Sequence, residues 1–204
     1  MVSKHLVLAG DSIFDNDGYV LGDLGVIEQL RRSVPKEWSC SKVAVDGDCM
    51  RDVARQIADL PSNTTDLIVS VGGNDVLSHA SLLSEIGKPK DLDELIEVPL
   101  RDFEAGYKNM LAKISGKPVS AHVCTVYTAI PFEDPVWCEF VPLALNRFNQ
   151  VIEEEASCLG IPVLRLDKIC VEPGDFSAVS PIEPSSQGGQ KIVDHIVSHL
   201  TARS

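Results

Sequence analysis

Short apolar runs alternate with segments of helical periodicity along almost the whole chain, and this alternation limits the folds that are possible. Runs of strand character lie at residues 6–9, 42–45, 67–71, 119–127 and 162–166. Apolar residues at helical spacing follow them at 26–34, 51–60, 103–114, 145–159 and 192–200. Strands separated by helices form parallel β-α-β units, with helices covering both faces of the sheet. The pattern therefore predicts an α/β fold: a three-layer α/β/α sandwich around a parallel five-stranded sheet.

The chain has the length of one domain. At 204 residues it can bury one substantial core, and it contains no repeat, low-complexity tract or linker. We therefore expect a single domain over residues 1–204. The segment Ser84–Glu97, which contains Gly87-Lys-Pro-Lys90, is expected to be an excursion on the surface, either a lid or a decoration.

Charge and hydropathy exclude several classes of partner. Eighteen basic and thirty acidic residues give a net charge of −12, which repels phosphate backbones and anionic lipid, so we expect no nucleic-acid partner. The apolar run at the N-terminus, His5 to Ala9, is too short for a secretory signal. No stretch approaches the ~20 apolar residues of a membrane span, so we expect no membrane insertion. These features predict a cytoplasmic protein.

The cysteines are scattered and form no CxxC pair. Without a secretory signal, we expect all of them to be reduced thiols, several of them buried. Histidines and cysteines do not cluster at metal-ligand spacing either, so neither a metal nor another cofactor is expected. The six positions are Cys40, Cys49, Cys124, Cys138, Cys158 and Cys170.

Small and polar residues follow the first three strands directly. Asp11-Ser12 follows the first strand, Gly47 the second, and Asn74-Asp75 the third. In an open parallel sheet, functional groups gather in the crevice beyond the carboxyl ends of the strands. The sequence thus predicts a site that combines these three loops with the loop before the last helix.

These residue types suit acyl transfer. The Ser12 hydroxyl is a candidate nucleophile, and its own N–H, the Gly47 N–H and the Asn74 amide are candidate donors to one developing oxyanion. Each piece alone also fits a simpler structural role, since Gly-Asp-Ser and Gly-Gly-Asn-Asp sequences form ordinary turns and helix caps. Asp11 and Asp75 are expected to accept hydrogen bonds from nearby backbone N–H groups.

Three sequence blocks carry a resemblance to a known family. Gly10-Asp11-Ser12-Ile13 resembles the block of the SGNH/GDSL hydrolases that carries the nucleophilic serine. Val45-Asp46-Gly47 resembles the block whose glycine donates to the oxyanion hole, and Gly72-Gly73-Asn74-Asp75 the block whose asparagine donates from its side chain. The resemblance implies a flavodoxin-like sandwich that hydrolyses small-molecule carboxylic esters or related acyl groups without a cofactor.

The fourth block departs from that family. Its pattern is Asp-x-x-His-Pro, with histidine as general base and aspartate as its orienter, whereas this chain has Ser180 and Glu183 at the matching positions. Glu183 is a candidate base only if burial raises its pKa well above the usual ~4.3. The alternative is a helix N-terminal residue stabilised by the helix dipole.

Two further alternatives remain, because the histidine that serves the family as general base is missing from the fourth block. His79, five residues beyond Asn74, is near enough to the expected site to act as the base. The chain could instead be a catalytically impaired pseudoenzyme that binds a ligand or a partner. A nucleotide-binding flavodoxin-like protein would need a glycine-rich phosphate loop, and Gly10-Asp-Ser-Ile-Phe-Asp is not one. The sequence leaves the oligomeric state and the particular ester open.

Overall fold

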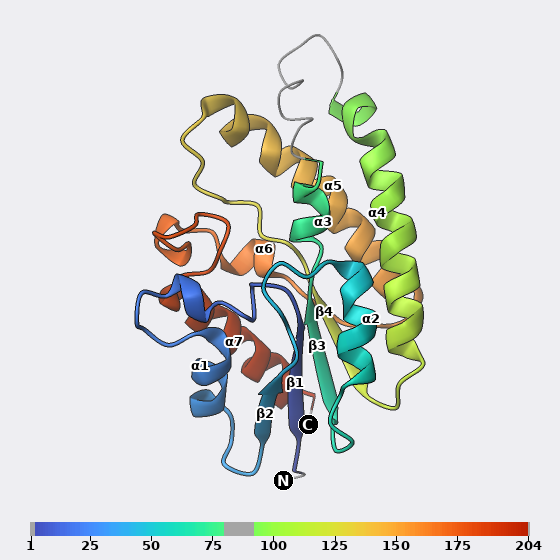
Figure 1. Cartoon of the computed structure of the whole chain (residues 1–204), viewed down its shortest axis with the longest axis vertical. Helices are drawn as coiled ribbons and strands as arrows, with labels where there is room; N and C mark the ends of the chain where they lie inside the picture. Colours follow the sequence, from blue (N-terminus) through green and yellow to red (C-terminus); the bar gives the residue numbers. More distant parts are fainter. Residues whose placement is uncertain (1–2, 80–91, 204) are drawn as a thin grey trace.

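The computed structural model describes residues 3–79 and 92–203, and its elements alternate as strands and helices (Figure 1). The strands are β1 (His5–Gly10), β2 (Ser39–Lys42), β3 (Asp66–Ser70), β4 (Ser120–Cys124) and β5 (Val163–Leu164). The helices are α1 (Val26–Ser33), α2 (Met50–Ala58), α3 (Gly73–Leu77), α4 (Leu92–Ser115), α5 (Pro135–Cys158), α6 (Leu166–Ile169) and α7 (Ser186–Thr201). Two 3-10 turns, η1 (Asp17–Tyr19) and η3 (Pro173–Asp175), complete the described elements.

The sheet is parallel throughout, with strand order β2-β1-β3-β4-β5. The chain moves from β1 to one neighbour, β2, and then crosses to the other neighbour, β3. This change of direction opens a crevice beyond the carboxyl ends of β1 and β3. The predicted fold class, a three-layer α/β/α sandwich with a parallel five-stranded sheet, is confirmed.

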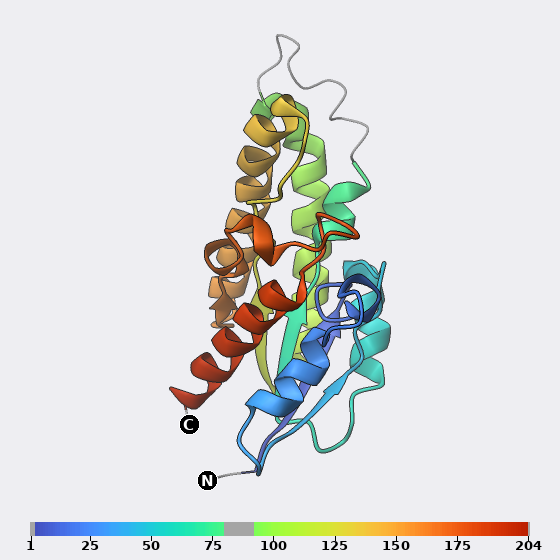
Figure 2. The ribbon, with the colours of Figure 1, turned by 90° about the vertical axis from the view of Figure 1, so that its left-hand side faces the viewer.

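Helices cover both faces of the sheet (Figures 1 and 2). Alternate residues of β1 point to opposite faces, as the pleat of a strand requires. Leu6 and Leu8 pack with α1 and α7, whereas Val7 and Ala9 pack with α2, α4 and α5. Each side chain of this strand interior is fully buried, which explains why the first strand reads as a continuous apolar run.

The predicted position of the second strand was wrong by three residues. We expected residues 42–45, but β2 is Ser39–Lys42 and pairs with His5–Leu8 of β1. β2 lies at the edge of the sheet and is only partly buried, so it needs no apolar run. The apolar residues Val43 and Ala44 follow the strand, and both backbone amides donate to the Leu8 carbonyl.

The expected surface excursion was also partly wrong. Leu92 to Glu97 form the first turns of the long helix α4, and the remainder of the Ser84–Glu97 segment lies outside the described residues. The internal Pro99 and the sequence Gly87-Lys-Pro-Lys90 hid this helix start. Similarly, α5 begins at Pro135, ten residues before the first periodic apolar residue that we used.

The N-terminal halves of α4 and α5 extend beyond the carboxyl end of the sheet, as both views show (Figures 1 and 2). Arg147 of α5 connects the two helices through a two-point hydrogen bond to Asp93 of α4, at 3.0 and 2.9 Å. The extension encloses space above the crevice. Within the described residues, no helix has the length and apolar character needed to cross a membrane. All six cysteines are free thiols, as predicted.

Candidate active site

Ser12 lies in a tight turn that begins where β1 ends. Gly10 has φ +124°, and a Cβ there would lie 1.7 Å from the Ser70 carbonyl oxygen of β3, so only glycine fits. Beyond it, the amides of Phe14 and Asp15 both donate to the Asp11 carbonyl, at 3.2 and 3.1 Å. This single turn holds Ser12 at the crevice, with 5% of its surface exposed.

The Ser12 hydroxyl donates to the Glu183 carboxylate, 171 residues further along the chain, with 2.9 Å between Oγ and Oε1. Glu183 is 5% exposed, and its other oxygen, Oε2, is buried with no hydrogen-bond partner among the described residues. The structure thus joins the two residues that the first and fourth blocks suggested.

Burial controls the acidity of Glu183. It raises the pKa of this carboxyl to about 7, while the Ser12 hydrogen bond lowers it and the negative charge of Asp46 raises it further. A carboxyl with this pKa is ionised in about half of the molecules at neutral pH. Glu183 therefore meets the condition that the sequence set for a carboxylate base.

Main-chain hydrogen bonds hold the loop that carries Glu183. Its carbonyl accepts from the Ser177 amide at 2.8 Å, and the Tyr127 hydroxyl donates to the carbonyl of the preceding Ile182. Asn16 Nδ2 donates to the carbonyl of Pro184 at 3.3 Å. Buried Tyr127, Asn16 and Ser177 were not expected from the sequence, and only the three-dimensional fold brings them to this loop.

Glu183 is not a helix N-terminal residue, so that alternative was wrong. Helix α7 begins at Ser186, and its cap is Ser185, whose Oγ accepts from the Gly188 amide at 3.1 Å. Ser180, which replaces the family's orienting aspartate, contacts Glu183 through the main chain: its carbonyl accepts from the Glu183 amide at 3.1 Å.

A second buried carboxyl, Asp11, adjoins the serine. Its Oδ1 accepts from the Ile13 amide at 3.2 Å, as expected of a structural acceptor. Burial, with the negative charges of Glu183 and Asp75, raises the pKa of Asp11 to about 8, although the hydrogen bond from the Ile13 amide lowers it. Asp11 is therefore mostly neutral at pH 7, which leaves Glu183 as the principal ionised carboxyl beside Ser12.

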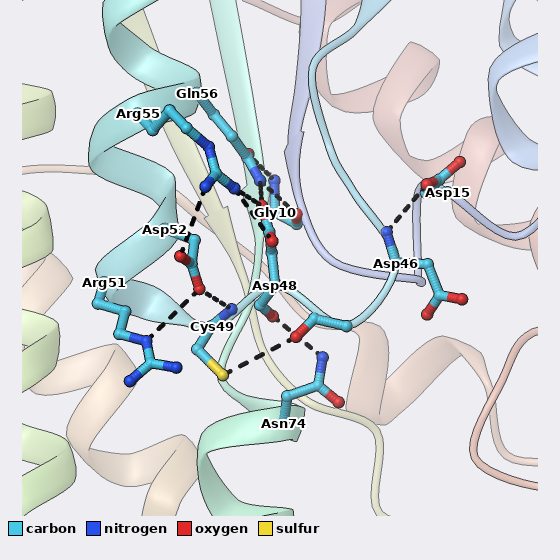
Figure 3. A network of polar contacts seen from close by, with 11 residues as sticks. Gly10, Asp15, Asp46, Asp48, Cys49, Arg51, Asp52, Arg55, Gln56 and Asn74 are labelled. Atoms are coloured by element: carbon cyan, nitrogen blue, oxygen red, sulfur yellow. Dashed lines mark hydrogen bonds and ion pairs between the residues drawn. The ribbon is translucent and has the colours of Figure 1, made fainter.

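The candidate oxyanion donors follow the carboxyl ends of β1, β2 and β3. Gly47 lies in the loop after β2 with φ +82°, a backbone conformation that favours glycine. The amides of Ser12 and Gly47 donate to no protein acceptor among residues 3–79 and 92–203. Asn74, in the first turn of α3, uses one amide hydrogen to reach the Asp48 carbonyl at 3.0 Å, which leaves the second hydrogen for a ligand (Figure 3).

Gln56 of α2 connects this loop to the end of β1 (Figure 3). Its Oε1 accepts from the Gly10 amide at 2.7 Å, and its Nε2 donates to the Gly10 carbonyl and to Asp48 Oδ2, both at 2.8 Å. Sequence reasoning missed Gln56. The available signal was a polar residue beside Ile57 on the apolar face of α2.

The remaining candidates lie nearby without contacting the serine hydroxyl. His79 follows α3, and its amide donates to the Val76 carbonyl at 3.0 Å. Asp75 Oδ2 accepts from the Met50 amide at 3.1 Å, which fixes the start of α2, as expected of a structural acceptor. Of the two candidate bases, Glu183 is the one whose side chain hydrogen-bonds to the Ser12 hydroxyl.

A cavity of about 220 Å³ opens beside Ser12 and Glu183. It lies beyond the ends of β3 and β4, between α3, α4 and α5, and its lining is mostly apolar. The site combines a serine–carboxylate pair, unpaired backbone donors and an apolar cavity. Such a set can bind a neutral acyl group and stabilise negative charge on its carbonyl oxygen.

Comparisons with known proteins identify the fold. No protein-family model matches the sequence, and no curated protein matches it. Among solved structures, a lipase from a goat rumen metagenome is 17% identical over 96% of each chain, with a TM-score of 0.73. A lipase/acylhydrolase from Enterococcus faecalis is 18% identical, covering 98% of this chain and 96% of that one, with a TM-score of 0.67. A member of the lipolytic G-D-S-L family from Veillonella parvula is 14% identical over 97% and 98% of the two chains, with a TM-score of 0.70. The chain thus has the fold of GDSL-type lipolytic hydrolases.

Proposed function

We propose that this chain is a serine ester hydrolase of the SGNH/GDSL type, acting on small-molecule carboxylic esters. The observation that carries the proposal is the buried hydrogen bond of 2.9 Å from Ser12 Oγ to Glu183 Oε1. A serine hydroxyl becomes a useful nucleophile when a base lies within hydrogen-bond reach. Solved structures of the same fold include lipases and an acetyl xylan esterase, which supports ester chemistry on this scaffold.

In the proposed first half-reaction, ionised Glu183 takes the hydroxyl proton of Ser12 as Oγ attacks the carbonyl carbon of the ester. The raised pKa of Glu183, about 7, makes the carboxylate a stronger base than an exposed glutamate. The resulting carboxylic acid then gives its proton to the departing alkoxide. An alcohol leaves, and the acyl group stays on Ser12.

The amides of Ser12 and Gly47 and the free Nδ2 hydrogen of Asn74 are the proposed donors to the tetrahedral oxyanion. Gln56 and Asp48 fix this loop before substrate arrives, so little reorganisation is needed during the reaction. Losing one such donor typically lowers the rate by ~10²–10³.

In the second half-reaction, Glu183 takes a proton from water, whose oxygen attacks the acyl carbon. The tetrahedral intermediate collapses, the Ser12 alkoxide regains the proton from Glu183, and the carboxylic acid is released. Each proton therefore moves through one carboxyl group, and the cycle ends with Ser12 and Glu183 in their starting states.

The test measures hydrolysis of p-nitrophenyl butyrate between pH 5 and pH 9 by wild type, Ser12→Ala, Glu183→Gln and His79→Ala. We expect Ser12→Ala to abolish turnover and Glu183→Gln to lower kcat by ~10²–10⁴. The wild-type rate should rise with an apparent pKa near 7, because Glu183 must lose its proton to act as base. His79→Ala should keep this acid limb.

Equal rates for wild type and Ser12→Ala on every ester would contradict the proposal. The chain would then be the binding module that the altered fourth block also allows. An acid limb lost in His79→Ala but kept in Glu183→Gln would instead assign the base to His79.

A further inference from the structure

Two apolar helix faces oppose each other above the crevice without filling the space between them. On α4 the lining residues include Leu92, Ile96 and Pro99, spaced so that they share one face of the helix. On α5, Val141 and Ala144 also line the cavity and share one face of the helix. Both helices extend past the end of the sheet here (Figure 2). The cavity is lined by residues of these two helices and by residues at the carboxyl ends of the strands, so it lies beyond the sheet.

An aromatic cluster supports one wall of the cavity. Phe148 of α5 lines the cavity and meets Phe103 of α4 edge to face, with 5.1 Å between ring centroids. Phe103 in turn stacks on Tyr107 at 5.7 Å. Ser12 and Glu183 also line the cavity, so a carbonyl group that reacts at Ser12 would lie against its wall. The cavity thus adjoins the candidate nucleophile directly.

The position of the oxyanion donors gives the substrate a direction. Gly47 follows β2, on one side of Ser12, and does not line the cavity, which lies on the β3 and β4 side. With its oxygen directed toward Gly47 and the Ser12 amide, a carbonyl group at Ser12 has one of the ester's two other substituents facing the cavity, and we assign the acyl chain to this place.

The lining determines which acyl groups fit. Among residues 3–79 and 92–203 the lining includes no lysine or arginine, and its acidic residues and histidine are Asp11, Glu183 and His79. A charged acyl chain would lose its hydration in these mostly apolar surroundings. An apolar cavity of about 150 Å³ accommodates benzene, so on that scale 220 Å³ accommodates roughly nine carbon atoms.

We propose that the cavity between α3, α4 and α5 binds the acyl chain of the substrate and selects neutral acyl groups of roughly six to ten carbons. This inference rests on the proposed ester hydrolysis and adds its substrate class. Ala144 is a specificity-determining position, because a larger side chain there would occupy the volume that the chain needs.

The first experiment compares kcat/KM for p-nitrophenyl esters from acetate to dodecanoate. Each methylene moved from water into an apolar site raises kcat/KM by about threefold to fourfold. We expect a rise up to about eight or nine carbons and a plateau or decline beyond. A profile that is flat or that falls from acetate onward, in an enzyme whose turnover depends on Ser12, would overturn the inference and leave the proposed function intact.

Ala144→Phe and Val141→Phe test whether the acyl chain binds in this cavity. A phenyl ring occupies over half of the cavity, so each variant should lower the octanoate-to-acetate ratio of kcat/KM at least tenfold. The matched control is Leu143→Phe, on the same helix but 51% exposed and outside the lining, which should keep the wild-type ratio. Circular dichroism and Tm identify any variant that fails to fold. If both folded cavity variants keep the wild-type ratio, the acyl chain binds elsewhere.

A binding measurement separates this inference from the proposed function. Ser12→Ala cannot turn over, so its affinity for octanamide, measured by calorimetry, reports on the cavity alone. We expect Ser12→Ala to bind octanamide more tightly than acetamide. Adding Ala144→Phe to Ser12→Ala should weaken octanamide binding at least tenfold. Octanamide binding without any ester hydrolysis would reject the proposed function but retain the cavity's preference. No difference between octanamide and acetamide would reject the preference.

Discussion

At the scale of single residues, the site depends on two carboxyl groups whose burial keeps them partly protonated near neutral pH. Glu183 has a pKa of about 7 and Asp11 a pKa of about 8, both raised mainly by burial. An exposed carboxylate would be a weak base for a serine hydroxyl. Burial gives Glu183 the acid–base range of a histidine, which explains how a glutamate can stand at the histidine position of the fourth block.

The pair predicts a bell-shaped pH profile for ester hydrolysis. Ionisation of Glu183 produces the active base as the pH passes about 7, whereas ionisation of Asp11 near pH 8 adds a second negative charge beside the oxyanion. Asp11→Asn should therefore remove the alkaline decline of kcat and keep the acid limb. The measurement is kcat from pH 5 to pH 9.5 for both proteins.

The asparagine keeps an oxygen that can accept from the Ile13 amide, so the turn around Ser12 should survive in Asp11→Asn. Thermal unfolding at pH 6 provides the control for folding. An alkaline limb that persists unchanged in this variant would show that another group causes the decline.

At the scale of elements, helix α2 fixes the oxyanion loop through Gln56. This side chain, 3% exposed, satisfies both backbone groups of Gly10 and also reaches Asp48 (Figure 3). Gln56→Leu leaves the Gly10 amide without a partner in the core, whereas the Gly10 carbonyl keeps the Val45 amide as a donor. We expect the free energy of unfolding to fall by about 1–3 kcal/mol, measured by urea denaturation.

The neighbouring Arg55 offers a matched control, because it also binds Asp48 but is largely exposed. Arg55→Ala should lower the free energy of unfolding by less than about 1 kcal/mol. Gln56→Leu should also lower kcat by about tenfold or more even where the protein is folded, since Asp48 also accepts from Asn74. Equal losses of stability in the two variants would refute this role for Gln56.

The elements also differ in how well sequence predicts them. β1 and β3 were clear because strands buried on both faces read as apolar runs. β2 was misplaced because an edge strand is free to be polar, and the apolar Val43 and Ala44 pack after the strand ends. The start of α4 was missed because Pro99 interrupts the helical pattern.

The candidate site could be predicted at the ends of β1 and β3, where the loop residues Ser12 and Asn74 follow buried strands. Its carboxylate chemistry could not, because the pKa of Glu183 depends on burial by residues from distant segments, such as Tyr127. The roles of Ser12, Gly47, Asn74 and Glu183 in catalysis stay predictions until the variants are measured.

At the scale of the whole molecule, buried carboxyls of opposite behaviour determine how stability depends on pH. Hydrogen bonds from Arg165 and Thr125 outweigh burial and hold the pKa of Asp167 at about 2. Partners such as Lys191 likewise lower the pKa of Asp175. These groups add stability above their unfolded pKa of ~4, and acidification removes it. The raised pKa values of Glu183 and Asp11 have the opposite effect, because they add stability at low pH that is lost as the pH rises.

Between pH 5 and pH 8, below the range in which ordinary cysteine thiols titrate, Glu183 and Asp11 should make the folded protein less stable as the pH rises. In the unfolded chain Glu183 and Asp11 ionise near 4.5 and 3.8, but in the folded protein only near 7 and 8. Through these two groups the folded state binds more protons across this range, so their contribution to the free energy of unfolding should fall as the pH rises. Burial lowers the pKa of His195 and of His199, which acts in the opposite direction. Relaxation around the ionised groups limits the loss to roughly 2–4 kcal/mol. Urea denaturation at pH 5, 6, 7 and 8 measures it. Asp11→Asn combined with Glu183→Gln should flatten the decline, whereas Ser12→Ala, equally inactive but with both carboxyls present, should keep it. A decline of equal size in the double variant would mean that other groups cause it, and that these two carboxyls ionise in the folded protein much as they do in the unfolded chain.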